Sequence, residues 1–292
     1  MSNAPDDPLW PEFKQLWRGL REAGEPVLIA GGYGLLLKQH WLRAESAVPC
    51  IVQLDRWLDV TARVTKDLDI VIGLDLIASE SAQSRLSQVM TKCGFEVSKK
   101  NPRWQFIKKL TGRDILVEFH SPLPETKSEH LQTDKVRVKH RPSLGQDGIH
   151  GRQNAEAVGS EYHPFPFEID DVSINVPNPV TWCNMKLTAM GDRWQKGQDQ
   201  EREEEYRKFH TEHAIKHARD VCRAVAMTTR DENDKAKSIV DAIRKTEVFV
   251  NAAKICDRFF GRDNAWGVGV VNRTWRAEDL VLIRDTLARW FS

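Results

Sequence analysis

Two carboxylates stand two residues apart, as Asp67 and Asp69, at the start of an apolar segment that ends at Ile72. Side chains alternate along an extended strand, so both acids would share one face while Leu68 and Ile70 point into the core. Carboxylates held close together repel each other unless solvent or a cation relieves them, and together they can bind a divalent cation. The spacing therefore indicates a candidate metal site, with a solvated strand end as the simpler alternative.

A glycine pair, Gly31-Gly32, precedes these acids in the chain. It lies between an apolar run over residues 27–30, which we interpret as a buried strand, and a helical pattern over residues 35–42. A strand that turns through glycines into a helix leaves backbone N–H groups at the helix N-terminus, where a phosphate can bind. The alternative is a tight turn without a ligand. Together with the two acids, the turn predicts a site for a nucleotide and a metal ion.

Two further acids lie on one face of another predicted strand, Asp114 and Glu118. Residues 104–110 and 113–120 are predicted to pair as a hairpin around Thr111-Gly112, because a two-residue loop with glycine second favours this turn. Asp114 and Glu118 share one face of the second strand but lie about 13 Å apart, so only one can join the first two acids. We favour Glu118, which is flanked by apolar residues where an unpaired carboxylate is costly, whereas Asp114 adjoins the turn.

The second half of the chain is predicted to be helical and carries further charged candidates. Lys186 and Arg193 lie seven residues apart, so on a helix they return to the same face after two turns. Asp220 follows in a later helical segment. Lys186 and Arg193 are candidates for contacts with a negatively charged substrate.

Two competing patterns occupy the same helical region. His210, His213 and His217 have spacings of three and four residues, which could bind zinc. Arg207 and His213 match an R-x5-H pattern found in ribonucleases of helical bundles. A histidine face beside charged residues is more often solvated than metal-bound, and the R-x5-H spacing often arises by chance.

The residues named above form a pattern that resembles the active-site signature of the nucleotidyltransferase superfamily, and specifically its AbiEii/AbiGii toxin branch. That branch carries G-G followed by R-[ST]-x-D-[IL]-D, and the matching positions here are Gly31, Gly32, Arg63, Thr65, Asp67, Leu68 and Asp69. Residues 117–122 are similar to the context of its third acid, with Glu118 in place of Asp. Residues 186–193 are similar to its K-L-x-A-x-x-x-R motif. Residues 216–223 resemble its final K-x-x-R-D motif, except that Arg223 stands where a second acid is expected.

The resemblance implies an enzyme that transfers NMP from an NTP to an acceptor with the help of one or two Mg²⁺ ions. The metal ligands would be Asp67, Asp69 and Glu118. The nucleotide-binding residues would be Gly31, Gly32, Arg63, Thr65, Lys186 and Arg193. The catalytic residues would be Asp67, Asp69, Glu118, Lys186 and Asp220. The resemblance also implies tRNA as the acceptor, the role of the toxin in a toxin–antitoxin or abortive-infection system, and a cognate antitoxin as a partner.

Two alternatives from other classes stay open. The first is a small-molecule nucleotidyltransferase of the antibiotic-modifying kind, which nothing in the sequence excludes. The second is a catalytically silent binding protein on the same fold, against which the intact set of three acids argues.

Composition narrows the class of protein further. The 292 residues include 43 basic and 42 acidic side chains, so a nucleic-acid-binding surface would have to come from local patches. No apolar run approaches a membrane span, and residues 1–8 lack a signal-peptide core, so we expect a cytoplasmic protein without membrane contacts. The five cysteines are scattered and contain no C-x-x-C pair, which indicates reduced thiols.

The elements that must position these residues predict an α+β fold. We expect a nucleotidyltransferase-like domain over residues 1–170, with a mixed sheet flanked by helices, and a helical bundle over residues 171–292. The predicted helices cover residues 9–23, 35–42, 79–92, 178 or 181–194, 235–260 and 277–292. The predicted strands cover residues 27–30, 63–72, 95–97, 104–110, 113–120, 135–139 and 172–176. Residues 46–61 contain either a strand over 50–54 or a short helix over 55–60. The basic alternation over 135–139 suits an edge strand or a patch that faces RNA.

Overall fold

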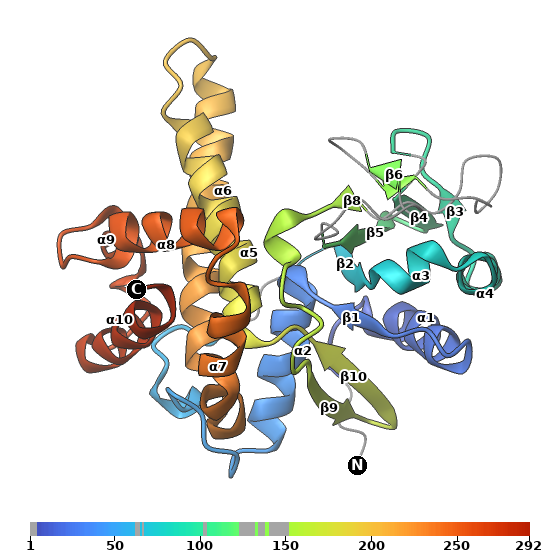
Figure 1. Ribbon diagram of the computed structural model, residues 1–292, viewed down its shortest axis with the longest axis horizontal. Coiled ribbons are helices and arrows are strands. Elements are labelled where there is room, and N and C mark those ends of the chain that lie inside the picture. The colour runs from blue at the N-terminus through green and yellow to red at the C-terminus, as the bar shows by residue number, and fades with distance from the viewer. Residues whose placement is uncertain are drawn as a thin grey trace. The chain divides into compact units, whose positions relative to one another are not determined.

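The computed structural model describes residues 5–61, 65, 67–101, 104–122, 132–133, 138–139 and 152–292. The fold is α+β, with a mixed sheet and helices in the N-terminal part and helices in the C-terminal part (Figure 1). The chain divides into two compact units: unit 1 comprises residues 1–41 and 63–177, and unit 2 comprises residues 42–62 and 178–292. Within the described ranges, no helix combines the length and apolarity needed to cross a membrane.

The main sheet of unit 1 has the strand order β1-β2-β5-β4-β3, and β8 pairs with the end of β5. β2 and β5 are parallel, whereas the β1–β2, β4–β5 and β3–β4 pairs are antiparallel. The strand bounds are β1 Val27–Ile29, β2 Asp67–Ile72, β3 Glu96–Val97, β4 Gln105–Leu110, β5 Arg113–Ser121 and β8 Arg152–Gln153. Two further pairs are β6 Gln132–Thr133 with β7 Val138–Lys139, and β9 Phe165–Ile169 with β10 Val172–Val176.

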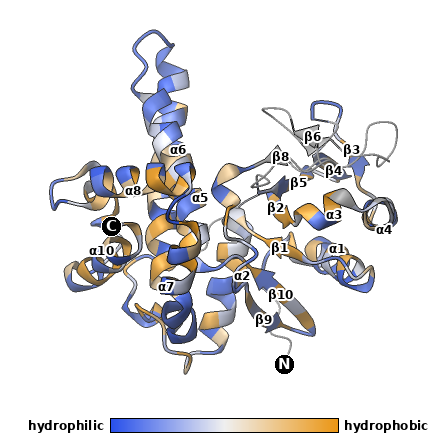
Figure 2. Ribbon diagram, viewed as in Figure 1, coloured by the Kyte–Doolittle hydropathy of each residue, from blue (hydrophilic) through white to orange (hydrophobic). Residues whose placement is uncertain are grey.

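Apolar side chains on the central strands form the core of unit 1. Leu68, Ile70 and Ile72 of β2 are fully buried, and burial of each such side chain contributes about 1.5–3 kcal/mol. Figure 2 shows most of β2 as hydrophobic. The polar exceptions in β2 are Asp67 and Asp69, which lie at its less buried start.

Helices complete unit 1. Their bounds are α1 Trp10–Glu22, α2 Gly31–Ala44, α3 Leu74–Ala78, α4 Glu80–Lys92 and the 3-10 helix η2 Ala155–Ala157; the last three residues of α2 belong to unit 2. Phe13, Leu16 and Trp17 recur at helical spacing in α1 and are buried. The indole Nε1 of Trp17 donates to the carbonyl of Ser173 at 2.9 Å, which fastens α1 to β10.

Unit 2 is built on helices. Their bounds are α5 Pro179–Gly197, α6 Glu204–Ala226, α7 Arg230–Ile243, α8 Glu247–Phe260, α9 Trp266–Val271 and α10 Ala277–Phe291. Side chains of Asn178, Thr229 and Thr246 cap α5, α7 and α8 by accepting from backbone N–H groups. α5 and α6 pack along each other, and their connecting tip is hydrophilic (Figures 1 and 2).

Residues 42–62 belong to unit 2, although they precede most of unit 1 in the sequence. Their backbone bonds to the α6–α7 junction: the amide of Ile51 donates to the carbonyl of Thr228 at 3.0 Å. Arg56, in the 3-10 helix η1 Leu54–Arg56, forms an ion pair of 2.5 Å with the buried Asp279 of α10. Trp57 packs against Trp275, with ring centroids 4.7 Å apart. This segment is therefore a structural part of unit 2.

Most of the expected elements are confirmed, and three expectations need correction. The expected boundary between residues 170 and 171 would cut the turn between β9 and β10, which pair in register; the division falls after residue 177. The segment over 46–61 forms neither a five-residue strand nor a regular helix over 55–60, but an isolated bridge at Cys50 and the turn η1. The strand β9 is the third correction, because it was not among the predicted strands.

All five cysteines are free, as expected. Residues 134–137 lie outside the described residues.

Candidate metal centre

Strand register brings three polar side chains of unit 1 to one face of the sheet. Asp69 of β2 is the direct cross-strand partner of Glu118 of β5, and Val71 is the partner of His120. Glu118 is in turn the partner of Gln105 on β4. Residues two apart on a strand share a face, so His120 follows Glu118 on the side that carries Asp69. Backbone pairing alone thus aligns the group.

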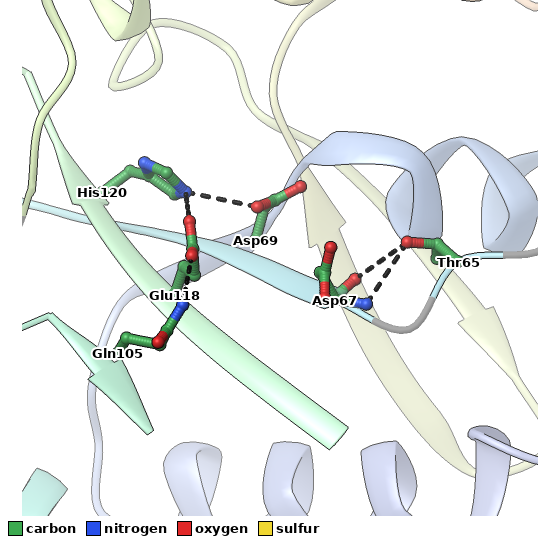
Figure 3. A network of polar contacts seen from close by, with 6 residues as sticks. All are labelled: Thr65, Asp67, Asp69, Gln105, Glu118 and His120. Carbon is green, nitrogen blue, oxygen red and sulfur yellow. Dashed lines mark hydrogen bonds and ion pairs between the residues drawn. The ribbon is translucent and has the colours of Figure 1, made fainter. Parts of the chain in front are cut away.

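The group has the geometry of a small ligand set (Figure 3). Nε2 of His120 lies 3.3 Å from Oδ1 of Asp69 and 3.8 Å from Oε2 of Glu118. One donor atom from each of the three residues lies within 4.8 Å of the other two. The imidazole is buried, with 8% of its side chain exposed, whereas 29% of Asp69 and 21% of Glu118 are exposed. Solvent therefore reaches the carboxylates from one side.

Glu118 is held by a chain of hydrogen bonds. The amide Nε2 of Gln105 donates to Oε1 of Glu118 at 2.6 Å. The hydroxyl of Ser98 donates to Oε1 of Gln105 at 2.7 Å, which turns the amide nitrogen toward the carboxylate. This chain fixes one oxygen of Glu118 and leaves the other toward His120.

Asp69 is held against the glycine turn. A Cβ atom on Gly31 would lie 1.8 Å from Oδ2 of Asp69, and Gly31 has a φ of +60°. The amide of Ala30 donates to the backbone carbonyl of Asp69 at 2.8 Å. α2 begins at Gly31, so the N–H groups of its first turn start beside this carboxylate. Only glycine fits this position.

The other acids proposed for this face lie elsewhere on it. Asp67 is at the exposed start of β2, where it is the cross-strand partner of Leu116 and its backbone amide donates to Oγ1 of Thr65 at 3.3 Å. Asp67 is not part of the close group formed by the described residues. Asp114 pairs with Lys109 near the hairpin turn, four residues before Glu118. Of the two candidates for the third acid, Glu118 is thus the one that lies opposite Asp69.

A cavity of about 520 Å³ lies further along the same face of unit 1. Its lining includes Leu28, Val71 and Pro122. Val71 is the cross-strand partner of both Leu28 and His120, so the cavity follows His120 directly on the sheet. Asp75 and Glu161 line it as well, which gives an apolar cavity with acidic groups.

The candidates in unit 2 make close polar contacts with one another. Nζ of Lys186 on α5 lies 3.2 Å from Oδ2 of Asp220 on α6, and both side chains are buried. Two helical turns further along α5, Nη1 of Arg193 donates to Nδ1 of His210 at 3.0 Å. These contacts join α5 to α6, so each of the four residues has a structural role within unit 2.

The histidine pattern on α6 does not form a close metal-ligand group. Burial, followed by the charge of Arg193, lowers the pKa of His210, and its Nδ1 already accepts from that guanidinium. Nδ1 of His213 lies 2.8 Å from the carbonyl of Phe209. Arg207 donates to Oε1 of Gln200 at 2.8 Å. In the part of the chain that the structure describes, the one close group of potential metal ligands is that of Asp69, Glu118 and His120.

The sequence analysis missed His120, because it considered only carboxylates as metal ligands on these strands. The signal was present, because His120 follows Glu118 by two residues on the predicted strand and must share its face. Two carboxylates and an imidazole at these distances suit a divalent cation, for which oxygen and nitrogen donors are the usual protein ligands. Arg63 lies outside the described residues.

No protein-family model matches the chain, and no curated protein matches it.

Proposed function

We propose that the chain is a metal-dependent nucleotidyltransferase that transfers NMP from an NTP and releases pyrophosphate. The observation that carries the proposal is the contact of Gly31 with Asp69, directly opposite Glu118. It joins the two parts of the signature, the glycine turn and the acid pair, into a single site. A phosphate at the start of α2 would therefore lie beside the carboxylates that hold a cation.

The reaction follows from charge. The acceptor hydroxyl would attack the α-phosphorus and lose its proton to solvent, a new O–P bond would form, the bond to the oxygen that bridges the α- and β-phosphorus would break, and pyrophosphate would leave. The site would supply a divalent cation, Mg²⁺ by the resemblance, whose charge would offset the negative charge on the phosphoryl oxygens. Asp69 and Glu118 would hold it, with Asp67 as the further acid of the signature. The backbone N–H groups of Gly31 and Gly32 would bind phosphate oxygens, while the space beside the Cα atom of Gly31 is filled by the Asp69 carboxylate.

The roles proposed for Arg63, Thr65, Lys186, Arg193 and Asp220 toward the nucleotide rest on the sequence resemblance alone. The same holds for tRNA as the acceptor, for the action as a toxin, and for a cognate antitoxin. The mutual contacts of the unit 2 residues are compatible with structural roles, so their variants need stability measurements beside activity.

A small organic acceptor is the second candidate, and the cavity beyond His120 favours it. Its volume of about 520 Å³ falls within the range of small-molecule sites, and its acidic groups suit a cationic molecule. An aminated antibiotic has this chemistry. The acceptor hydroxyl would then approach along the sheet face that carries Asp69 and Glu118.

The test is a labelling assay with each of the four α-labelled NTPs, a divalent cation and total RNA, run beside a mixture of aminoglycoside-type small molecules. We expect label in the tRNA fraction, and label in the small-molecule fraction would support the second candidate. Asp67→Asn and Asp69→Asn should each abolish transfer with little loss of stability, because Asp67 is exposed and the loss of the Asp69 charge relieves its repulsion with Glu118. Binding of NTP by the folded wild-type protein without transfer to either acceptor would favour a silent binding protein.

A further inference from the structure

We propose that His120 is a metal ligand, and that the site of Asp69, Glu118 and His120 therefore selects a first-row transition-metal dication over Mg²⁺. This inference refines the metal of the proposed function, but it concerns binding and can be tested without any transfer reaction.

The first supporting observation is the position of the His120 imidazole ring. Nε2 of His120 points between the two carboxylates, at 3.3 Å from Asp69 and 3.8 Å from Glu118, while most of the ring is buried. A cation bound by these carboxylates must lie next to Nε2, because the three donor atoms lie within 4.8 Å of one another. The imidazole would bind through this nitrogen in the tautomer that carries its proton on Nδ1.

The chemistry of the donors carries the second step. Mg²⁺ requires nearly octahedral oxygen ligation and loses water reluctantly, so a buried nitrogen donor contributes little to its binding. Manganese, cobalt and zinc dications accept imidazole together with carboxylates. A site with one imidazole and two carboxylates should therefore bind these ions more tightly than Mg²⁺.

The third supporting observation is that other residues orient the two carboxylates before a metal ion binds. Gln105 orients Glu118 with a hydrogen bond of 2.6 Å, and Gly31 lies against Asp69. Each carboxylate thus has a contact from outside the group, in addition to its proximity to His120. Supporting contacts of this kind affect metal affinity by about 10–100-fold in proteins. A simple His–Asp hydrogen bond in a sheet would not require that Glu118 be oriented from the opposite side.

Mn²⁺ is the probe of choice, because electron spin-echo modulation detects nitrogen bound directly to this ion. We expect the Mn²⁺-loaded wild-type protein to show ¹⁴N modulation, and protein grown with ¹⁵N-labelled histidine to replace it by the ¹⁵N pattern. This measurement needs no substitution at a buried position, so it does not depend on whether a variant folds. Absence of any histidine nitrogen signal in Mn²⁺-loaded protein would overturn the proposal.

Competition titrations measure the selectivity. We expect the wild-type protein to bind Mn²⁺ at least about tenfold more tightly than Mg²⁺ and His120→Asp to lose most of that preference, because it replaces nitrogen with oxygen. His163→Asn is the matched control, since His163 is an exposed histidine of unit 1. An unchanged Mn²⁺ preference in folded His120→Asp would also overturn the proposal.

Different results would contradict the proposed nucleotidyl transfer and the proposed role of His120. Nitrogen modulation without any nucleotidyl transfer would contradict the proposed function and leave the metal site intact. Mg²⁺-dependent transfer by a protein that shows no histidine nitrogen signal would do the reverse.

Discussion

The carboxylate of Asp69 occupies the space that a side chain of Gly31 would fill: an added Cβ atom would meet Oδ2 at 1.8 Å. This contact links two segments that are distant in sequence, the turn before α2 and the start of β2. It also ties the orientation of Asp69 to a backbone position with a φ of +60°. The proposed metal ligand Asp69 and the proposed phosphate-binding glycines are therefore in direct contact, and a change in either one should disturb the other.

Gly31→Ala should abolish transfer and weaken metal binding, because the new methyl group must displace the Asp69 carboxylate. Positive φ alone costs a residue other than glycine about 1–2 kcal/mol. Gly112→Ala is the control, since Gly112 has a φ of +79° and no atom within 4 Å of an added Cβ. Thermal unfolding and Mn²⁺ titration of both variants measure the difference. Equal metal affinity in the two variants would contradict the contact.

Gln105→Leu should lower metal affinity by about 10–100-fold, as expected for loss of a hydrogen bond that orients a ligand. The amide of Gln105 holds Oε1 of Glu118, and leucine of similar volume cannot donate to it. Ser98→Ala is a milder variant of the same chain, because it removes only the hydroxyl that orients the amide. Isothermal titration with Mn²⁺ should rank wild type, Ser98→Ala and Gln105→Leu in this order of decreasing affinity. A larger loss in Ser98→Ala than in Gln105→Leu would be inconsistent with this chain.

The local sequence pattern was sufficient to predict the hairpin of β4 and β5, which carries Glu118. A two-residue loop at Thr111-Gly112 fixes its register, so the pairing of Gln105 with Glu118 followed from the turn, although the sequence analysis did not draw that consequence. The parallel register of β2 with β5 did not follow from local pattern. The connection between them contains α3, α4 and further strands, and no turn rule fixes the pairing of Asp69 with Glu118.

Other misses have similar physical causes. β9 contains Pro166, which lowers the strand signal, yet its pairing with Asn175 of β10 leaves the alternation of Phe167 and Ile169 toward the core intact. Residues 42–62 have no regular period, because backbone bonds and single side chains such as Arg56 attach them to helices. Such long-range attachments leave no periodic signal in the sequence.

Lys186→Met should destabilise the protein by about 3–5 kcal/mol, because it leaves the buried Asp220 carboxylate without its ammonium partner. The double variant Lys186→Met/Asp220→Leu should recover much of this loss, since it removes the uncompensated charge as well. Lys196→Met is the matched control: the Lys196–Asp192 pair is exposed and its loss should cost well under 1 kcal/mol. Denaturant unfolding gives all four free energies.

If Lys186 serves only the nucleotide, the single variant should keep wild-type stability and lose activity. In that case the apparent KM for NTP would rise or kcat would fall without any change in the unfolding midpoint. Loss of stability together with activity would support a dual role, in which the α5–α6 contact also fixes the position of the ammonium group.

His210 should make the stability of the protein depend on pH. Burial and the neighbouring Arg193 and Lys196 lower its pKa, whereas Asp192 opposes them. The unfolded chain therefore binds a proton that the folded chain rejects, so stability should fall as the pH drops below the usual histidine pKa of about 6.5. His210→Gln removes the titrating imidazole. We therefore expect the unfolding midpoint of this variant to decline less than that of the wild type between pH 8 and pH 5. His163→Asn, at an exposed histidine, should follow the wild-type curve. Parallel declines in all three proteins would show that His210 carries no such linkage.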